Sequence, residues 1–265
     1  MNQISFITAN YVARATSYDG DEDWGKQERA TYAADSSAYF TAMAKDIAAA
    51  GFEAMDIWGA HCHFHQHAAG DYLEQIKGIC SQFDLAISSY AGWVSLQSPA
   101  DLEQPFKFIK QLGTDIMAGG IMGLPPEQLH PAVEQAAGKY GVRWAFENHS
   151  EKTPRDIFEK IGQGKFKHIG VALDTGWCGT QGMDALEAAK RLRDHLMILH
   201  LKDVKAAGRH DTCAAGDGVV ACEQVVRYLK QTAWQGTICI EHEPYDRDPM
   251  PECKMSLQRV REWLK

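Results

Sequence analysis

The chain has 265 residues, of which 45% are hydrophobic and 23% charged, and it carries a formal net charge of −8. This length is close to the roughly 250 residues of one (β/α)8 barrel, and the composition is that of a globular protein. Nucleic-acid-binding proteins usually present a basic surface, so the acidic balance disfavours a nucleic-acid partner and favours a small-molecule substrate. No run approaches about 18 uninterrupted apolar residues, so we expect no membrane partner.

Seven cysteines are scattered along the chain without any CxxC pair, at positions 62, 80, 178, 213, 222, 239 and 253. An odd, unpaired set of this kind indicates free thiols in a reducing compartment. The N-terminal segment lacks a basic stretch followed by an apolar one, so it does not resemble a secretory signal. We therefore expect a cytoplasmic protein.

Short apolar runs alternate with longer amphipathic stretches from one end of the chain to the other. The runs predict eight strands, at Ile4–Ala9, Ala54–Trp58, Leu85–Tyr90, Asp115–Ala118, Val142–Glu147, Ile169–Asp174, Met197–Lys202 and Thr237–Glu241. Several are rich in β-branched and aromatic residues, as buried strands are. The intervening stretches predict helices, and two of these begin with a capping hydroxyl followed by proline, at Ser98-Pro99 and Thr153-Pro154.

Strict alternation of strands and helices predicts a parallel sheet, either a closed barrel or an open doubly wound sheet. Eight units over this length favour the barrel, and no GxGxxG follows the first strand. No linker divides the chain, so we predict an α/β fold in which residues 1–265 form a single-domain (β/α)8 TIM barrel. The segments 10–35 and 205–221 are longer than is needed to join a strand to the helix that follows it. In a barrel such connections lie at the active-site face, so both are candidate lids or specificity loops.

Four polar residues end four consecutive predicted strands on the inward-facing side. They are Glu147, Asp174, His200 and Glu241. Alternate residues of barrel strands point inward, so these side chains should meet at the C-terminal rim. Three carboxylates around one imidazole would repel each other unless a divalent cation joined them, and this donor set suits Mn²⁺, Mg²⁺, Co²⁺ or Zn²⁺. The alternative is that each residue faces water at the rim.

Five short motifs resemble the sugar phosphate isomerase/epimerase, or xylose isomerase-like, TIM-barrel superfamily. They are FENH (146–149), ALDTG (172–176), HLKD (200–203), GDG (216–218) and IEHEP (240–244). The resemblance covers essentially the whole chain and is densest over 142–245. It implies that Glu147, Asp174, His200 and Glu241 hold one divalent metal, for which Mn²⁺ is the first expectation. It also implies that Glu147 and Glu241 are the acid/base pair, as in ketose 3-epimerases.

Lys202 lies two residues beyond His200 on the same inward face, and HxKD occurs in family members that resemble inosose dehydratases. It is a candidate catalytic residue that stabilises an oxyanion or protonates a leaving hydroxyl. A structural ion pair with a rim carboxylate is the alternative.

Five further residues are candidates for substrate contact, namely His61, His149, Trp177, Arg209 and Glu243. Trp177 stands where many family members carry a histidine, which weakens a direct transfer of the ketose-epimerase mode of substrate binding. His61 also begins a histidine-rich run, 61–67, for which a second metal site is an alternative. The short GDG motif is compatible with either phosphate binding or a turn.

The leading functional prediction is a metal-dependent isomerase or epimerase of a monosaccharide or keto-sugar. It would remove a proton next to a carbonyl and pass through an enediolate that the metal stabilises. A dehydratase or lyase acting on a keto-sugar or keto-inositol is the alternative, since it begins with the same step. An endonuclease IV-like DNA-repair enzyme is an alternative of another class, against which the net charge and Trp177 argue. The relatives implied by the resemblance suggest a homo-oligomer, a dimer or a tetramer.

Overall fold

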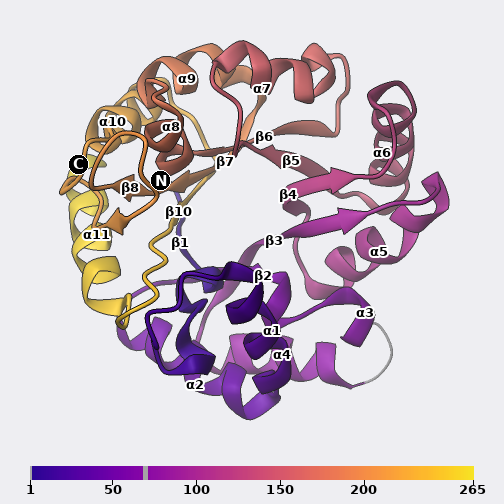
Figure 1. Ribbon diagram of the computed structural model, residues 1–265. Helices are drawn as coiled ribbons and strands as arrows, with labels where there is room; N and C mark the ends of the chain where they lie inside the picture. The colour runs from indigo at the N-terminus through magenta and orange to yellow at the C-terminus, as the bar shows by residue number, and fades with distance from the viewer. Residues whose placement is uncertain (1, 68–70) are drawn as a thin grey trace.

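The computed structural model describes residues 2–67 and 71–265, which form a closed barrel of eight parallel strands surrounded by helices (Figure 1). Going around the barrel, the strands follow the order β1-β10-β7-β6-β5-β4-β3-β2. Their bounds are β1 Ile4–Ile7, β2 Ala54–Trp58, β3 Ala86–Ser95, β4 Ile116–Met122, β5 Arg143–Glu147, β6 Ile169–Asp174, β7 Leu196–Leu201 and β10 Thr237–Ile240. All eight predicted strands and the barrel are therefore confirmed.

The α-helices of the described chain fill the connections between strands. They are α1 Trp24–Ala34, α2 Ser37–Ala49, α3 Phe64–His67, α4 Tyr72–Gln82, α5 Glu103–Leu112, α6 Pro126–Tyr140, α7 Pro154–Lys160, α8 Thr175–Gln181, α9 Ala185–Leu192, α10 Cys222–Gln231 and α11 Met250–Trp263. Thr153 caps α7 as predicted, since its hydroxyl accepts a hydrogen bond from the backbone N–H of Asp156. Ser98 and Asp101 form the same reciprocal cap at a 3-10 turn, Pro99–Leu102, which leads into α5.

Strands β3 and β4 are longer than their apolar runs predict, and they extend to Ser95 and Met122. The extension is rich in glycine, which has a low strand propensity and therefore hides the continuation in the sequence. Gly119 has φ +121°, and a Cβ there would lie 2.1 Å from the carbonyl oxygen of Gly92 on the neighbouring strand. Only glycine allows the two backbones to approach so closely.

The barrel interior is filled by small side chains. Ala118, Ala145, Ala172 and Cys239 are fully buried there, while large residues such as Trp144 pack between the strands and the helices. Small residues leave space above them, so the inward residues at the ends of the strands can converge on a cavity.

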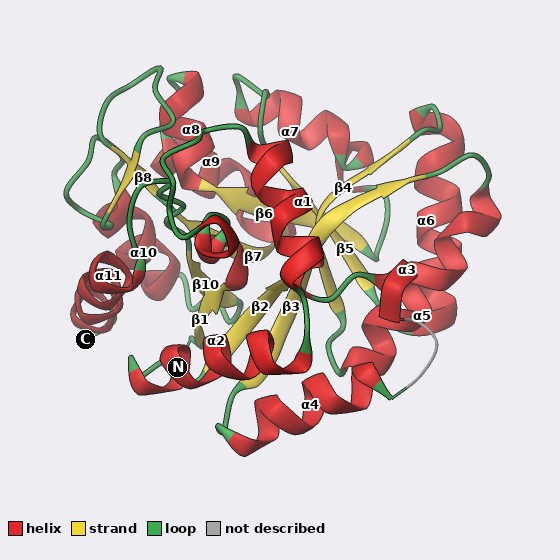
Figure 2. Cartoon of the chain, turned by 60° about the horizontal axis from the view of Figure 1, so that its bottom comes forward, coloured by secondary structure: helices red, strands yellow, loops and turns green. Residues whose placement is uncertain are grey.

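The two long connections fold against the mouth of the barrel. The first contains α1, and the second contains β9 Thr212–Cys213, which pairs with β8 Asp203–Val204 just before the connection in a short hairpin. Figure 2 shows α1 and the loops that flank β8. In the part of the chain that is described, none of the helices combines the length and the apolarity that a transmembrane span requires.

Candidate active site

Three of the four predicted metal-binding side chains, Glu147, His200 and Glu241, form one group of possible ligands at the carboxyl ends of β5, β7 and β10. His200 Nδ1 lies 2.7 Å from Glu147 Oε1 and 3.1 Å from Glu241 Oε2. Asp174 stands beside them, with its Oδ2 3.6 Å from Lys202 Nζ, which is itself 2.9 Å from Glu241 Oε1. The strand alternation that the sequence predicted therefore brings these residues to one place.

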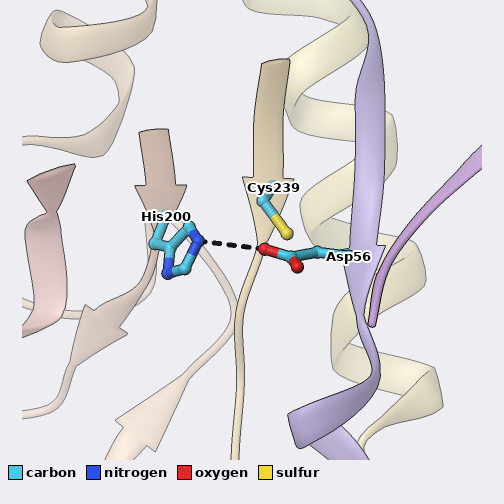
Figure 3. Close-up of side chains that lie close together, drawn as sticks. All are labelled: Asp56, His200 and Cys239. Atoms are coloured by element: carbon cyan, nitrogen blue, oxygen red, sulfur yellow. Dashed lines mark hydrogen bonds and ion pairs between the residues drawn. The ribbon is translucent and has the colours of Figure 1, made fainter. Parts of the chain in front are cut away.

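Asp56 holds the other side of the His200 ring, and it comes from the interior of β2 (Figure 3). Its Oδ2 lies 3.1 Å from His200 Nε2, and both side chains are fully buried. Because a carboxylate accepts, Nε2 carries the hydrogen and Nδ1 faces Glu147 and Glu241. A carboxylate behind a metal-binding histidine orients the ring in this way in many metal centres. Cys239 lies close to the same pair.

Lys202 is the second buried cation of the site. Its Nζ lies 2.9 Å from Glu241 Oε1 and 2.5 Å from Glu243 Oε2. Burial by itself would lower the pKa of Lys202, but Glu241, Glu243 and Asp174 raise it above its ordinary value. Burial likewise opposes a charge on His200, yet Glu147 and Asp56 raise its pKa, so both residues are cationic in the metal-free protein.

Carboxylates still outnumber these two cations. They are Asp56, Glu147, Asp174, Glu241 and Glu243. Asp174 Oδ2 is buried without a hydrogen-bond partner, and its ion pair with Lys202 Nζ is long, at 3.6 Å. Burial raises the pKa of Asp174, and the negative Glu241 and Glu147 add to the effect. Buried carboxylate oxygens without a donor are costly, and a divalent cation satisfies them, so the residues present fit such an ion.

A cavity of about 340 Å³ opens above this cluster, and its size is that of small-molecule sites. Its walls are Ile7, Ala9, Trp24, Trp58, Ala91, Gly92, Trp93, Glu147, His149, Trp177, Lys202, His210, Glu241, Glu243 and Tyr245. Six of the predicted catalytic and substrate-binding residues are among them, namely Glu147, His149, Trp177, Lys202, Glu241 and Glu243. A larger hollow of about 910 Å³ at the opposite end of the barrel contains none of the predicted site residues.

His61, a candidate for substrate contact, does not line the cavity. The side chain is fully buried behind Trp58, and its Nδ1 lies 3.1 Å from the hydroxyl of Thr8. The histidine-rich run is not one extended strand, because it begins at the end of a 3-10 turn, η3 (Gly59–His61), and continues into α3. Within the described residues, no side chain of that run belongs to a group that could hold a metal.

Arg209 is exposed and also lies outside the cavity walls. It lines a second hollow of about 500 Å³, which shares His210, Glu243 and Tyr245 with the first. The loop therefore contributes its histidine to the first cavity and its arginine to the neighbouring space.

Two aromatic residues of the cavity wall, Trp24 and Tyr245, were not predicted from the sequence. Trp24 opens α1 in the long first connection and packs edge-on against Trp58, with ring centroids 5.2 Å apart. No strand alternation predicts its position. Tyr245, in contrast, continues the inward series 239, 241 and 243, and that signal could have revealed it.

The GDG motif forms a turn around Asp203. The Asp203 carboxylate accepts hydrogen bonds from the backbone N–H groups of Gly216 and Gly218 at 2.8 and 3.1 Å. A Cβ at Gly218 would lie 2.3 Å from Asp203 Oδ1. These N–H groups already have an anionic partner within the chain, so the structure favours the turn over phosphate binding.

A closed parallel barrel with carboxylates around an imidazole at its C-terminal mouth defines a TIM-barrel protein with a candidate metal centre. The chain belongs to the xylose isomerase-like TIM barrel family, whose model matches residues 44–265. No curated protein matches it in sequence.

Solved structures share the fold at low identity. The probable 3-DHS dehydratase AsbF of Bacillus anthracis has a TM-score of 0.69 at 13% identity, with 98% of each chain covered. The IOLI protein, in a crystal structure with a zinc atom, has a TM-score of 0.70 at 12% identity over 99% of this chain and 98% of its own. The 3-keto-D-glucoside 4-epimerase YcjR of E. coli has a TM-score of 0.63 at 17% identity over 84% and 94%.

Proposed function

We propose that this protein is a divalent-metal-dependent isomerase or epimerase of a monosaccharide or keto-sugar. The observation that carries the proposal is the placement of two glutamates. Glu147 and Glu241 both line the cavity, and their carboxylates lie 2.7 and 3.1 Å from the same nitrogen of His200. Two carboxylates around one point can serve opposite sides of a bound substrate.

Glu147, Asp174, His200 and Glu241 would hold the cation, with Mn²⁺ as the first expectation. A divalent ion at this place supplies Lewis-acid polarisation of a carbonyl and its neighbouring hydroxyl. The protein supplies the proton transfers. Glu147 or Glu241 removes the proton on the carbon next to the carbonyl, and the same or the opposite glutamate returns one. Each positioned transfer accelerates the reaction by about 10²–10⁴-fold.

The surrounding residues hold the substrate for these transfers. Trp58, Trp93 and Trp177 offer flat apolar walls for the faces of a sugar, and His149 and Glu243 lie within reach of its hydroxyls. The similarity in fold to a 3-keto-D-glucoside 4-epimerase supports a substrate of this class.

The second candidate is a dehydratase or lyase, and one contact favours it. Lys202 Nζ lies at the cavity wall 2.5 Å from Glu243, so an ammonium stands where it could protonate a leaving hydroxyl. The fold is also shared with a probable 3-DHS dehydratase. In that reaction the electron pair freed by proton removal forms a C=C bond and expels the β-oxygen as water.

The test combines metal analysis with hydrogen exchange. Protein purified without chelator should hold about one metal per chain, and His200→Ala should lose it. Incubation with keto-sugars in deuterated water should place deuterium next to the carbonyl, and Glu147→Gln should abolish this incorporation while the fold is retained. An ultraviolet-absorbing conjugated carbonyl would identify the lyase. A protein that holds no metal and gains no exchange with Mn²⁺, Co²⁺ or Zn²⁺ would refute the proposal.

A further inference from the structure

The charges around the cavity distinguish between classes of sugar. Of the described residues that line it, Lys202 alone is a lysine or arginine, and Asp174, Glu241 and Glu243 already surround its ammonium. Glu147 adds a further carboxylate. The described walls therefore hold no lysine or arginine that is free of carboxylate partners and could neutralise an anionic substituent. The nearby carboxylates disfavour such a substituent.

His149 presents a hydrogen-bond acceptor to the cavity. Its Nδ1 lies 3.1 Å from the backbone carbonyl oxygen of Glu147, which can only accept, so Nδ1 carries the hydrogen. In the neutral ring Nε2 is then an acceptor. The ring lies between Trp93 and Trp177, with centroid distances of 5.1 and 5.2 Å, and this packing fixes its direction.

A different hydrogen bond places the ring hydrogen of His210 on Nδ1. The Thr180 hydroxyl donates its only hydrogen to the carbonyl oxygen of Arg209 at 2.8 Å. His210 Nδ1, which lies 3.3 Å from the Thr180 oxygen, must therefore be the donor in that contact. Its Nε2 is left as an acceptor. Burial, reinforced by the positive Lys202, lowers the pKa of His210 to about 3, so the ring is neutral.

A stacked pair of rings positions His210. It lies on Trp177 with a centroid distance of 4.1 Å and an interplanar angle of 23°. His149 packs against the same indole, so Trp177 holds both histidines. The cavity is thus lined by the rings of both histidines and by several carboxylates. Hydroxyl groups can donate to these atoms, whereas phosphate dianions and carboxylates have no hydrogen to donate.

We propose that the substrate is an uncharged polyhydroxylated compound, and that Nε2 of His210 accepts a hydrogen bond from one of its hydroxyls. This inference rests on the proposed function and narrows it to neutral sugars. His210 becomes a specificity-determining residue supplied by the long loop after β7.

The neighbouring hollow does not provide a place for a phosphate. Its walls carry the cations Lys205, Arg209 and Arg247 and the carboxylates Glu22, Asp211, Glu243 and Asp246. Lys205 lies 3.1 Å from Asp211, and Arg247 lies 2.7 Å from Asp246. Two of the three cations are therefore paired, and Glu22 balances the charge of the third, so this hollow offers no excess of positive charge to a phosphate.

Tryptophan fluorescence measures binding independently of turnover, because four tryptophans line the cavity. Mn²⁺-loaded protein is titrated with D-fructose and D-tagatose, and in parallel with D-fructose 6-phosphate and D-gluconate. We expect at least one neutral ketose to bind at least tenfold more tightly than both anions. Equal or tighter binding of either anion, or binding of no neutral ketose, overturns the proposal.

Two substitutions then test His210 directly. His210→Phe keeps a ring on Trp177 but removes the acceptor, so ketose binding should weaken by about 3–10-fold, as expected for one hydrogen bond. His210→Gln retains an acceptor oxygen and should restore part of the binding. His195→Phe, the corresponding exchange at the opposite end of the barrel, should bind like wild type. Unchanged binding by a folded His210→Phe overturns the role of this residue.

The same samples separate this inference from the proposed function. Metal content and deuterium incorporation are measured on each. A protein that holds metal and exchanges hydrogen only with a phosphorylated sugar retains the proposed function and refutes the neutral-substrate class. A protein without metal or exchange on any sugar refutes the proposed function itself.

Discussion

Asp56→Asn tests whether His200 is a metal ligand oriented by a buried carboxylate. The Asp56 carboxylate lies 3.1 Å from His200 Nε2, and neither side chain is exposed. Asparagine keeps an oxygen that can accept from Nε2–H but removes the negative charge that makes the ring a stronger ligand. Loss of such a partner weakens metal binding by about 10–100-fold, or about 1.4–2.7 kcal/mol.

The assay is competition for Mn²⁺ against a fluorescent chelator, on protein whose fold is checked by circular dichroism. Cys239→Ala is the matched control, because Cys239 lies close to Asp56 and His200 but does not belong to the group that Glu147, His200 and Glu241 form. Burial raises the pKa of the Cys239 thiol well above its ordinary value, so we expect this control to bind Mn²⁺ normally. If Asp56→Asn binds Mn²⁺ as tightly as wild type, Asp56 does not support His200 as a metal ligand. If Cys239→Ala loses the metal and Glu147→Gln keeps it, the metal does not bind at Glu147.

Three further predictions concern stability, each measured by urea denaturation. Lys202→Met leaves three buried carboxylates without their counter-ion, which should lower the free energy of unfolding of the metal-free protein by about 3–5 kcal/mol; an unchanged value would contradict the charge on Lys202. Gly119→Ala places a Cβ 2.1 Å from a backbone oxygen at positive φ and should lower the free energy of unfolding by about 2–4 kcal/mol. In the control Gly120→Ala, the new Cβ meets the half-exposed ring of Trp93, which can move, so the loss of stability should be smaller. Glu252→Gln removes the carboxylate charge whose contacts with His242, at 2.8 Å, and Arg247, at 2.9 Å, hold the pKa of Glu252 down to about 2. A carboxyl group whose pKa is lower in the folded than in the unfolded protein stabilises the fold at pH values above its unfolded pKa of about 4.3, and this stabilisation is lost as the pH falls towards 2. Glu252→Gln should therefore lower the free energy of unfolding by about 1–2 kcal/mol at pH 7 and leave it unchanged at pH 2. A loss of stability that persists at pH 2 would show that the carboxylate charge is not its cause.

The strand pattern of the sequence was sufficient to predict the barrel and the convergence of four side chains. In a closed parallel barrel, every strand ends at the same rim and alternate residues point inward. Glu147 and Glu241 are therefore brought together by strand position alone, although they lie far apart in the chain. The same rule extends to Lys202, Glu243 and the unpredicted Tyr245, which all follow inward positions.

Contacts made by loops and by turns could be decided only by the tertiary structure. His61 follows a strand but enters a 3-10 turn that buries it behind Trp58, and the alternation rule ceases to apply at that turn. His210 and Arg209 are adjacent in one loop, yet only the histidine lies against Trp177. Side-chain direction along a strand follows from a fixed period of two residues, whereas in a loop it depends on packing against residues distant in the chain. The sequence thus determined which residues lie at the bottom of the cavity, and tertiary packing determined which residues form its walls.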